Sequence, residues 1–137
     1  MNILEIPFVH KVGLTRTHEG NLTLQMDQSN ENHLQTVHAS AQFTLAETIS
    51  GEAMQLAFPH LVGKVIPILR ESHIKFKKPA TGNIYGLAHI DGEAKVKFEE
   101  QLTKKGRAIL SIEVEIKDNN ETTTCIGQFD WFIQKIE

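Results

Sequence analysis

The chain has 137 residues, of which 40% are hydrophobic and 23% are charged, and its formal net charge at pH 7 is -3. This length predicts one domain, residues 1–137, with a single core. The weakly acidic charge gives no reason to expect nucleic-acid binding, and no apolar run approaches the ~18 residues of a membrane-spanning helix. Cys125 is the only cysteine, which excludes an internal disulfide. The N-terminus lacks a signal-peptide pattern, so we expect a cytoplasmic protein.

The first third of the chain predicts a short arm, a hairpin and a loop. Residues 2–8 are apolar around Pro7 and predict an arm or a turn of helix that packs on the body. Residues 14–18 and 22–26 have strand-like alternation around Gly20, which is typical of a β-hairpin. Residues 27–35 are polar and rich in turn formers, so they predict a loop that leads into the next element.

A long helix should follow this loop. Apolar residues recur at helical spacing as far as Phe58, and Pro59 disfavours helical geometry in the residue before it. Thr36 or Ser40 could cap its start. Glu47 lies in the middle of this small and apolar segment, so we expect it to be buried or half-buried. Glu52 lies about 140° further round the helix and is predicted to be exposed or interfacial.

The rest of the chain reads as strands, with no second long amphipathic helix. The predicted strand runs are residues 64–78, 84–90, 96–102, 110–116 and 125–133, separated by turn signals that include Asp91 and Gly92. Pro67 predicts an edge strand or a bulge. The small residues around Gly86 leave room for something bulky to approach. The element order predicts an α+β fold in which the helix lies across the concave face of a curved antiparallel sheet of about five to six strands, mostly a meander.

The stretch that begins at Asn32 resembles the hotdog thioesterases of the phenylacetate-degradation type. The resemblance rests on Asn32, on His38 six positions later and on Glu47 nine positions after the histidine. In that family a matching Asn, His-Gly-Gly and Leu-Ala-Asp or Leu-Ala-Glu set occurs at this spacing, and the two glycines are Ala39 and Ser40 here. The resemblance implies a hotdog fold and hydrolysis of an acyl-coenzyme A or acyl-carrier-protein thioester. It implies no cofactor other than the coenzyme A of the substrate.

The resemblance also assigns roles to residues. Glu47 would activate water as a general base or attack the thioester carbonyl directly. Asn32 would position the carbonyl or the water, while His38 would shape the loop and donate a structural hydrogen bond. Unpaired N–H groups at the helix start would stabilise the oxyanion. The residues expected to bind the oxyanion or the substrate are Ala39, Ser40, Phe43 and Thr48. Hotdog active sites lie where two subunits meet, so we expect a homodimer or a higher homo-oligomer.

Each of these residues also has a purely structural interpretation. Glu47 could lie on a solvated helix face, Asn32 could be a turn residue, and His38 could be a structural histidine. His33 and His38 lack a cysteine or carboxylate at supporting spacing, so no metal site is expected. Cys125 is expected in the core. A set of basic residues could bind coenzyme A phosphates or form a solvated face: Lys75, Lys77, Lys78, Lys95, Lys97, Lys104, Lys105 and Arg107.

Two other functions stay open at this point. His33 and Glu47 are fourteen residues apart, a separation that resembles the one between His and Glu in carrier-protein dehydratases, although the proline-glycine segment of those enzymes is missing. Hydroxyacyl-thioester dehydration or hydration is therefore the first alternative. The second is a non-catalytic acyl-coenzyme A binding module.

Overall fold

The computed structural model describes residues 2–136 of the chain. It contains six strands, three α-helices and two short 3-10 helices within that range. In chain order these are η1 Ile3–Glu5, α1 Pro7–Val12, β1 Leu14–Arg16, β2 Leu22–Gln25, α2 Ala39–Ala57, η2 Pro59–Leu61, β3 Val65–Phe76, β4 Asn83–His89, α3 Gly92–Lys105, β5 Arg107–Lys117 and β6 Thr123–Lys135.

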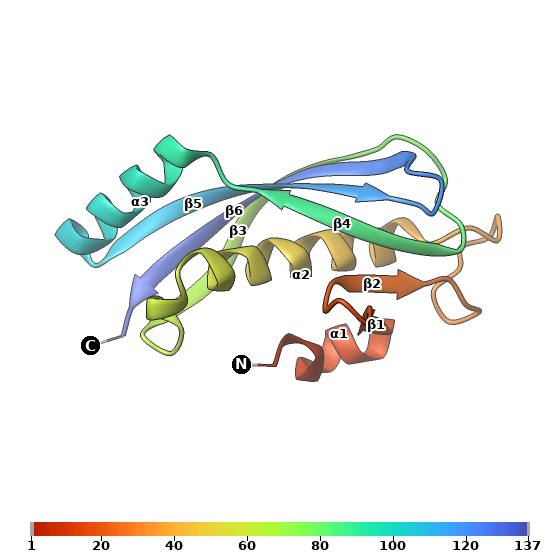
Figure 1. The fold of residues 1–137 in the computed structure, drawn as a ribbon, viewed down its shortest axis with the longest axis horizontal. Helices are drawn as coiled ribbons and strands as arrows, with labels where there is room; N and C mark the ends of the chain where they lie inside the picture. Colours follow the sequence, from red (N-terminus) through yellow and green to blue (C-terminus); the bar gives the residue numbers. More distant parts are fainter. Residues whose placement is uncertain (1, 137) are drawn as a thin grey trace.

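The six strands form one antiparallel sheet in the order β1-β2-β4-β5-β6-β3. The sheet curls around α2, as Figure 1 shows, so the predicted wrapping of a long helix by a curved sheet is confirmed. The predicted meander is correct only for β4, β5 and β6. The strand β3 lies at the far edge beside β6, and the hairpin joins the opposite side through β2 and β4. Pro67 therefore lies in an edge strand, as predicted, with a bulge at Leu69 and Glu71.

The central helix α2 matches the predicted span closely. It begins after His38 and ends at Ala57, one residue before the Phe58 and Pro59 boundary that the sequence predicts. Its sheet-facing side is buried against the inner faces of β5 and β6, whose alternate residues form the core. Polar contacts also cross this interface: the buried Thr124 hydroxyl of β6, for example, donates to Gln42 Oε1 of α2 at 2.9 Å.

The helix approaches β4 closely at Gly86. A Cβ at this position would lie 2.5 Å from Ile49 Cδ1 and 2.9 Å from Ile116 Cδ1, which is closer than real Cβ contacts. The bulky group predicted to pack on the small residues of this strand is therefore Ile49 of α2. Only glycine leaves space for α2 to sit this near to the sheet.

The strand predicted for residues 96–102 is wrong, because this segment lies in the helix α3. Asp91 is its N-cap, with Oδ2 accepting from the Ala94 N–H at 3.3 Å, and Gly106 ends it with a φ of 74°. Phe98 and Leu102, one helical turn apart, are the buried residues of α3. Phe98 packs against Phe58 at the end of α2, with ring centroids 5.0 Å apart. The predicted turn at Asp91 is instead a helix start.

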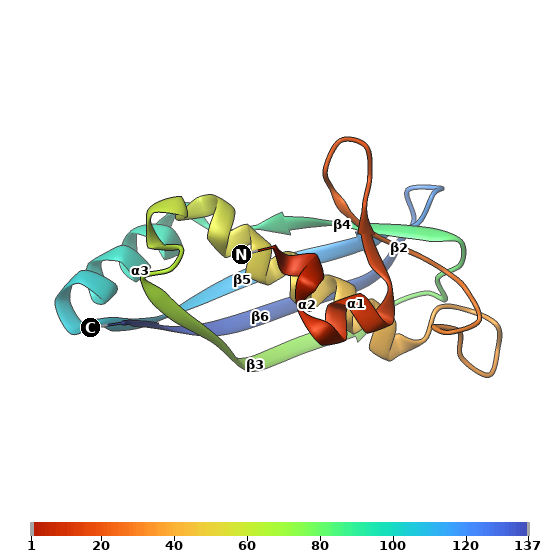
Figure 2. The same cartoon turned by 90° about the horizontal axis from the view of Figure 1, so that it is seen from below.

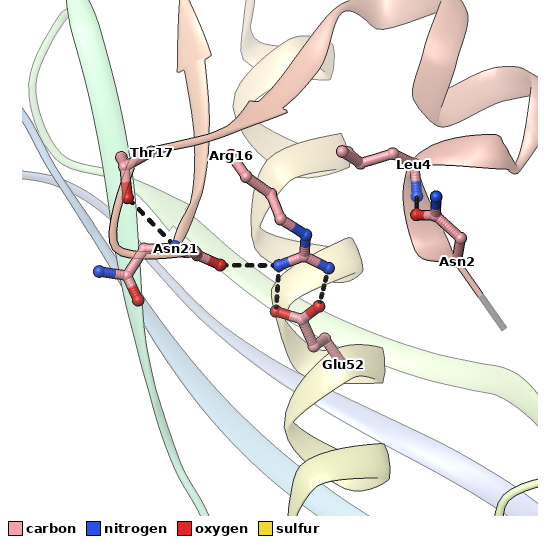
Figure 3. Close-up of polar contacts among 7 residues, drawn as sticks. Asn2, Leu4, Arg16, Thr17, Asn21 and Glu52 are labelled. Carbon is pink, nitrogen blue, oxygen red and sulfur yellow. Dashed lines mark hydrogen bonds and ion pairs between the residues drawn. The ribbon is translucent and has the colours of Figure 1, made fainter.

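The N-terminal segment, residues 2–12, packs on α2 on the side away from the sheet, as Figure 2 shows. The predicted arm that packs on the body is thus confirmed as η1 and α1. The adjoining hairpin is fixed to α2 by Arg16, whose guanidinium makes a bidentate ion pair with Glu52 and also donates to the Gly20 carbonyl (Figure 3). Glu52 is therefore half-buried at an interface between two elements. Among the helices of residues 2–136, none combines the length and apolar character that crossing a bilayer requires.

Candidate functional site

Glu47 lies half-buried in the middle of α2, in agreement with the prediction from its apolar neighbours. Burial raises the pKa of its carboxyl above the ordinary value of 4.5, and among residues 2–136 no hydrogen bond or opposite charge acts against this effect. An ionisable group without a partner that is partly removed from water is a common mark of a functional site. Glu47 is therefore half-buried rather than fully solvated.

The carboxylate lines a cavity of about 280 Å³. The walls come from four parts of the chain, and most of their side chains are apolar. The lining residues are Ile3, Ile6, Phe8 and Val9 of the N-terminal segment, Glu47, Thr48, Gly51 and Gln55 of α2, Pro67 of β3 and Trp131 of β6. A concave, mostly apolar space with a few polar groups is typical of a small-molecule site.

Trp131 forms the wall on the sheet side of the cavity. Its indole N–H donates to Ser50 Oγ at 2.8 Å, and that hydroxyl donates in turn to the Glu47 carbonyl at 2.6 Å. The ring packs on Gly51, where an added Cβ would lie 3.3 Å from Trp131 Cζ2. The two bonds and the close packing hold the indole in one orientation one helical turn from the Glu47 carboxylate.

Thr48 lines the same cavity and is 3% exposed. Its Oγ1 is buried and has no hydrogen-bond partner, the one such side-chain atom found in residues 2–136. A buried hydroxyl without a partner costs stability, so it contrasts with the neighbouring Ser50 hydroxyl, which is bonded. Of the predicted substrate-binding residues, Thr48 alone lies in the cavity with Glu47.

Asn32 is used within its own loop. Its Oδ1 accepts from the N–H groups of Leu34 and Thr36, and its Nδ2 donates to Thr36 Oγ1 at 2.8 Å. These contacts are typical of an asparagine that organises a turn. In a single chain the Asn32 amide does not line the cavity that contains Glu47.

His38 is the N-cap of α2 and lies where the loop meets the helix, while its role in shaping a catalytic loop stays a prediction. Its ring Nδ1 accepts a hydrogen bond from the Ser40 N–H at 3.0 Å, whereas the expected role of this ring was that of a donor. The expectation that the Ser40 N–H is unpaired is therefore wrong, because a histidine side chain caps it. The Ala39 N–H keeps no partner among residues 2–136 and is the donor left at this helix start.

The helix start and Glu47 are too far apart to act on one carbonyl within a single chain. Eight residues separate Ala39 from Glu47, which is about 12 Å along the axis at ~1.5 Å per residue, whereas hydrogen-bond reach is about 3 Å. Phe43, between them, packs edge-on against Phe129 with ring centroids 5.6 Å apart and does not line the cavity. Within one chain the Glu47 carboxylate and the start of α2 are therefore two separate features.

The remaining candidates lie outside the Glu47 cavity. Cys125 is fully buried, and burial raises the pKa of its thiol to about 11, so it is a core residue as predicted. Within residues 2–136 no three His, Cys, Asp or Glu side chains are grouped so that they could hold a metal ion. The predicted basic set is divided between two regions, one in and after β3 and the other in α3 and at the start of β5.

Most of the cavity wall does not follow from the sequence. The pattern predicts only an arm for residues 2–8 and an apolar strand face for Trp131, and it assigns neither to the site. Two signals were present: Gly51 lies four residues after Glu47, where a small residue opens that helix face, and the chain has a single tryptophan. Neither signal identifies its partner without the fold.

A protein-family model matches nearly the whole chain and shows the family to which it belongs. A family model described as a domain of unknown function, DUF4442, matches residues 6–133. This chain belongs to the DUF4442 family. Its matched span covers α1, the helix with Glu47 and the whole sheet to the end of the core of β6. No curated protein matches the chain.

Several solved structures have the same fold as this DUF4442 chain. A protein from Pseudomonas aeruginosa described as a probable thioesterase superimposes with a TM-score of 0.81 at 28% identity, over 98% of this chain and 91% of its own. A thioesterase from Haemophilus influenzae superimposes with a TM-score of 0.76 at 16% identity, and the match covers 97% of this chain and 86% of that protein. A Bacillus halodurans protein solved with CoA superimposes with a TM-score of 0.64 at 20% identity, and the match covers 82% of this chain and 69% of that protein. These neighbours are thioesterase-like hotdog-fold proteins, and this DUF4442 chain has the hotdog fold.

Proposed function

We propose that the protein is an acyl-thioester hydrolase that acts on acyl-coenzyme A or on an acyl-carrier protein. The observation that carries this proposal is the partner-free, half-buried Glu47 carboxylate in the wall of an apolar cavity. An apolar wall suits an acyl chain, and the carboxylate suits proton removal or nucleophilic attack beside it. The thioesterase-like neighbours and the CoA held by one of them support the same chemistry.

In the general-base route, ionised Glu47 takes a proton from a water as the water oxygen bonds to the carbonyl carbon. The carbon–sulfur bond then breaks, Glu47 passes its proton to the departing sulfur, and the thiol and the free acid leave with Glu47 ionised again. In the nucleophilic route, a Glu47 oxygen bonds to the carbonyl carbon and displaces the thiolate, and water then opens the resulting anhydride. Both routes build negative charge on the carbonyl oxygen, which needs a hydrogen-bond donor.

We propose that a second copy of the chain supplies this donor. Within one chain the Ala39 N–H is about 12 Å along the helix from Glu47, so both cannot contact one thioester carbonyl. Two α2 helices placed side by side in opposite directions would bring the helix start of one chain to the Glu47 of the other. A homodimer is therefore the smallest assembly with a complete site, in which Asn32 and His38 hold the loop that presents the donor.

A thiol-release screen tests the function. The protein would be incubated with acetyl-, butyryl-, octanoyl-, palmitoyl- and phenylacetyl-coenzyme A, and the free thiol would be measured against time. We expect thiol release from at least one ester. Hydration of an enoyl-coenzyme A without thiol release would favour the dehydratase alternative, and ligand binding without turnover across the panel would favour the non-catalytic one.

A further inference from the structure

The N-terminal segment supplies one whole wall of the cavity beside Glu47. Ile3, Ile6, Phe8 and Val9 all line it, and all four side chains are apolar. The segment lies on α2 on the side away from the sheet (Figure 2). Its lining residues belong to the same chain as Glu47, so this wall needs no second subunit.

We propose that this wall selects the acyl group, with Ile6 and Phe8 as the specificity-determining residues. The inference rests on the proposed function and adds to it the part of the substrate that the segment contacts. An acyl chain whose thioester carbonyl lies at Glu47 extends along apolar side chains, because the other walls are Trp131, Pro67 and the helix itself. The substrate class is an acyl thioester with an unsubstituted apolar chain of limited length.

The four lining residues of the segment differ in burial, so two of them fix the segment to the core and the other two can be replaced. Ile3 and Val9 are 5% and 4% exposed, so they fix the segment to the core. Ile6 is half-buried and Phe8 is 63% exposed, so both can change without emptying the core. Each methylene of acyl chain that the wall accommodates is worth roughly a fourfold gain in binding, which makes the size of these two side chains decisive for length.

Leu4 provides a matched control within the same segment. It is a partly buried apolar residue of η1, two positions from Ile6, and it packs against the core without lining the cavity. Replacing it by alanine removes apolar contacts of the same kind and disturbs the segment to a similar degree. A change in acyl preference that appears in Ile6→Ala but not in Leu4→Ala therefore comes from the wall itself.

The experiment compares kcat/KM for octanoyl- and dodecanoyl-coenzyme A in wild type, Ile6→Ala, Ile6→Phe, Phe8→Ala and Leu4→Ala. We expect the dodecanoyl-to-octanoyl ratio to rise by roughly fourfold or more in Ile6→Ala and Phe8→Ala. The ratio should fall in Ile6→Phe, which fills the cavity, and stay at the wild-type value in Leu4→Ala. Equal ratios in all five proteins, with wild-type hydrolysis intact, overturn the proposed wall and leave the proposed function standing.

A binding measurement separates failure of the wall from failure of the function. Trp131 is the single tryptophan and lines the cavity, so its fluorescence reports occupancy without any turnover. The same proteins would be titrated with S-octyl- and S-dodecyl-coenzyme A thioethers, which cannot be hydrolysed. If wild type releases no thiol from any ester, the proposed function fails. The wall is then supported by a shift toward the dodecyl thioether in Ile6→Ala, and overturned by unchanged preference or by no change in Trp131 emission.

Discussion

At the scale of single residues, the cavity contains two side chains whose environment costs stability. Glu47 loses solvation without gaining a partner, and the Thr48 hydroxyl is buried without a hydrogen bond. Stored costs of this kind persist where a side chain serves a purpose other than stability. Both residues lie on the cavity side of α2, whereas Ser50 and Gln42, which face the sheet, are bonded.

Replacing Thr48 by valine keeps the shape of the side chain and removes the unpaired hydroxyl. We expect the free energy of unfolding to stay the same or to rise, because no hydrogen bond is lost. Thr124→Val is the matched control, since it removes the donor to the buried Gln42 Oε1 and should cost about 1–3 kcal/mol. Urea unfolding measures both. A loss of stability in Thr48→Val as large as in Thr124→Val would contradict the unpaired state of the hydroxyl.

The raised pKa of Glu47 predicts a pH dependence of stability with a definite sign. As pH rises past the ordinary value of 4.5, the unfolded chain releases this proton while the folded chain still holds it, so the free energy of unfolding falls. The loss is complete once pH exceeds the folded pKa. The variant Glu47→Gln does not titrate, so its stability relative to wild type should increase from pH ~4 to pH ~7. A constant or decreasing difference in urea unfolding between these two pH values would be the opposite result.

At the scale of elements, the sequence predicted α2, both hairpin strands and four of the five strand runs, because their apolar periodicity matches the face that each buries. It failed at α3. Val96 and Phe98 alternate with lysines as in a strand, but Val96 is 56% exposed, and the buried pair is Phe98 and Leu102 at helical spacing. The helix signals were present in Asp91 at the N-cap and Gly106 at the end. The pattern around Asp91 predicts a turn instead, because aspartate and glycine serve turns and helix ends alike.

The site was predicted only in part, for a reason of geometry. Glu47 is identifiable because its sequence neighbours on α2 are apolar, a local property. The wall that faces it is formed by residues 3–9 and by Trp131, which lie near opposite ends of the sequence. No local sequence pattern predicts that these two segments contact α2 at the same place. The pairing of β3 with β6 is missed for the same reason, since the two strands are far apart in sequence.

The contact between α2 and β4 depends on Gly86. Gly86→Ala should lower the free energy of unfolding by about 1–3 kcal/mol, because its Cβ would overlap Ile49 Cδ1. The double variant with Ile49→Val, which removes that methyl, should recover part of the loss. Gly92→Ala is the control, since an added Cβ there meets nothing within 4 Å. Thermal unfolding distinguishes the three, and equal losses in Gly86→Ala and Gly92→Ala would contradict the close approach.

At the scale of the whole molecule, the sheet has one short edge and one long edge. The strand β1 has three residues, whereas β3 has twelve and carries the exposed apolar side chains of Ile66, Ile68 and Phe76. Proteins rarely leave a long apolar edge strand unpaired. The proposed homodimer therefore has a natural place along β3, and Pro67 of this strand also lines the Glu47 cavity.

This arrangement predicts that the protein is a dimer and that a charged residue introduced on β3 weakens the dimer. Sedimentation equilibrium should give the mass of two chains for wild type and a concentration-dependent shift toward one chain for Ile68→Lys. Val96→Lys places the same charge on an exposed apolar position of α3 and should leave the mass unchanged. A monomeric wild type that still hydrolyses thioesters would contradict the shared site.

The most direct measurement of the whole account is thiol release by Glu47→Gln on whichever acyl-coenzyme A the wild type hydrolyses best. We expect a loss of turnover of at least about a hundredfold, with a folded protein of unchanged oligomeric mass, because the amide can neither accept the proton nor attack the carbonyl. Glu52→Gln removes the other half-buried carboxylate of α2 and should keep turnover while it weakens the contact with Arg16. Hydrolysis at the wild-type rate by purified Glu47→Gln would contradict the central role of Glu47.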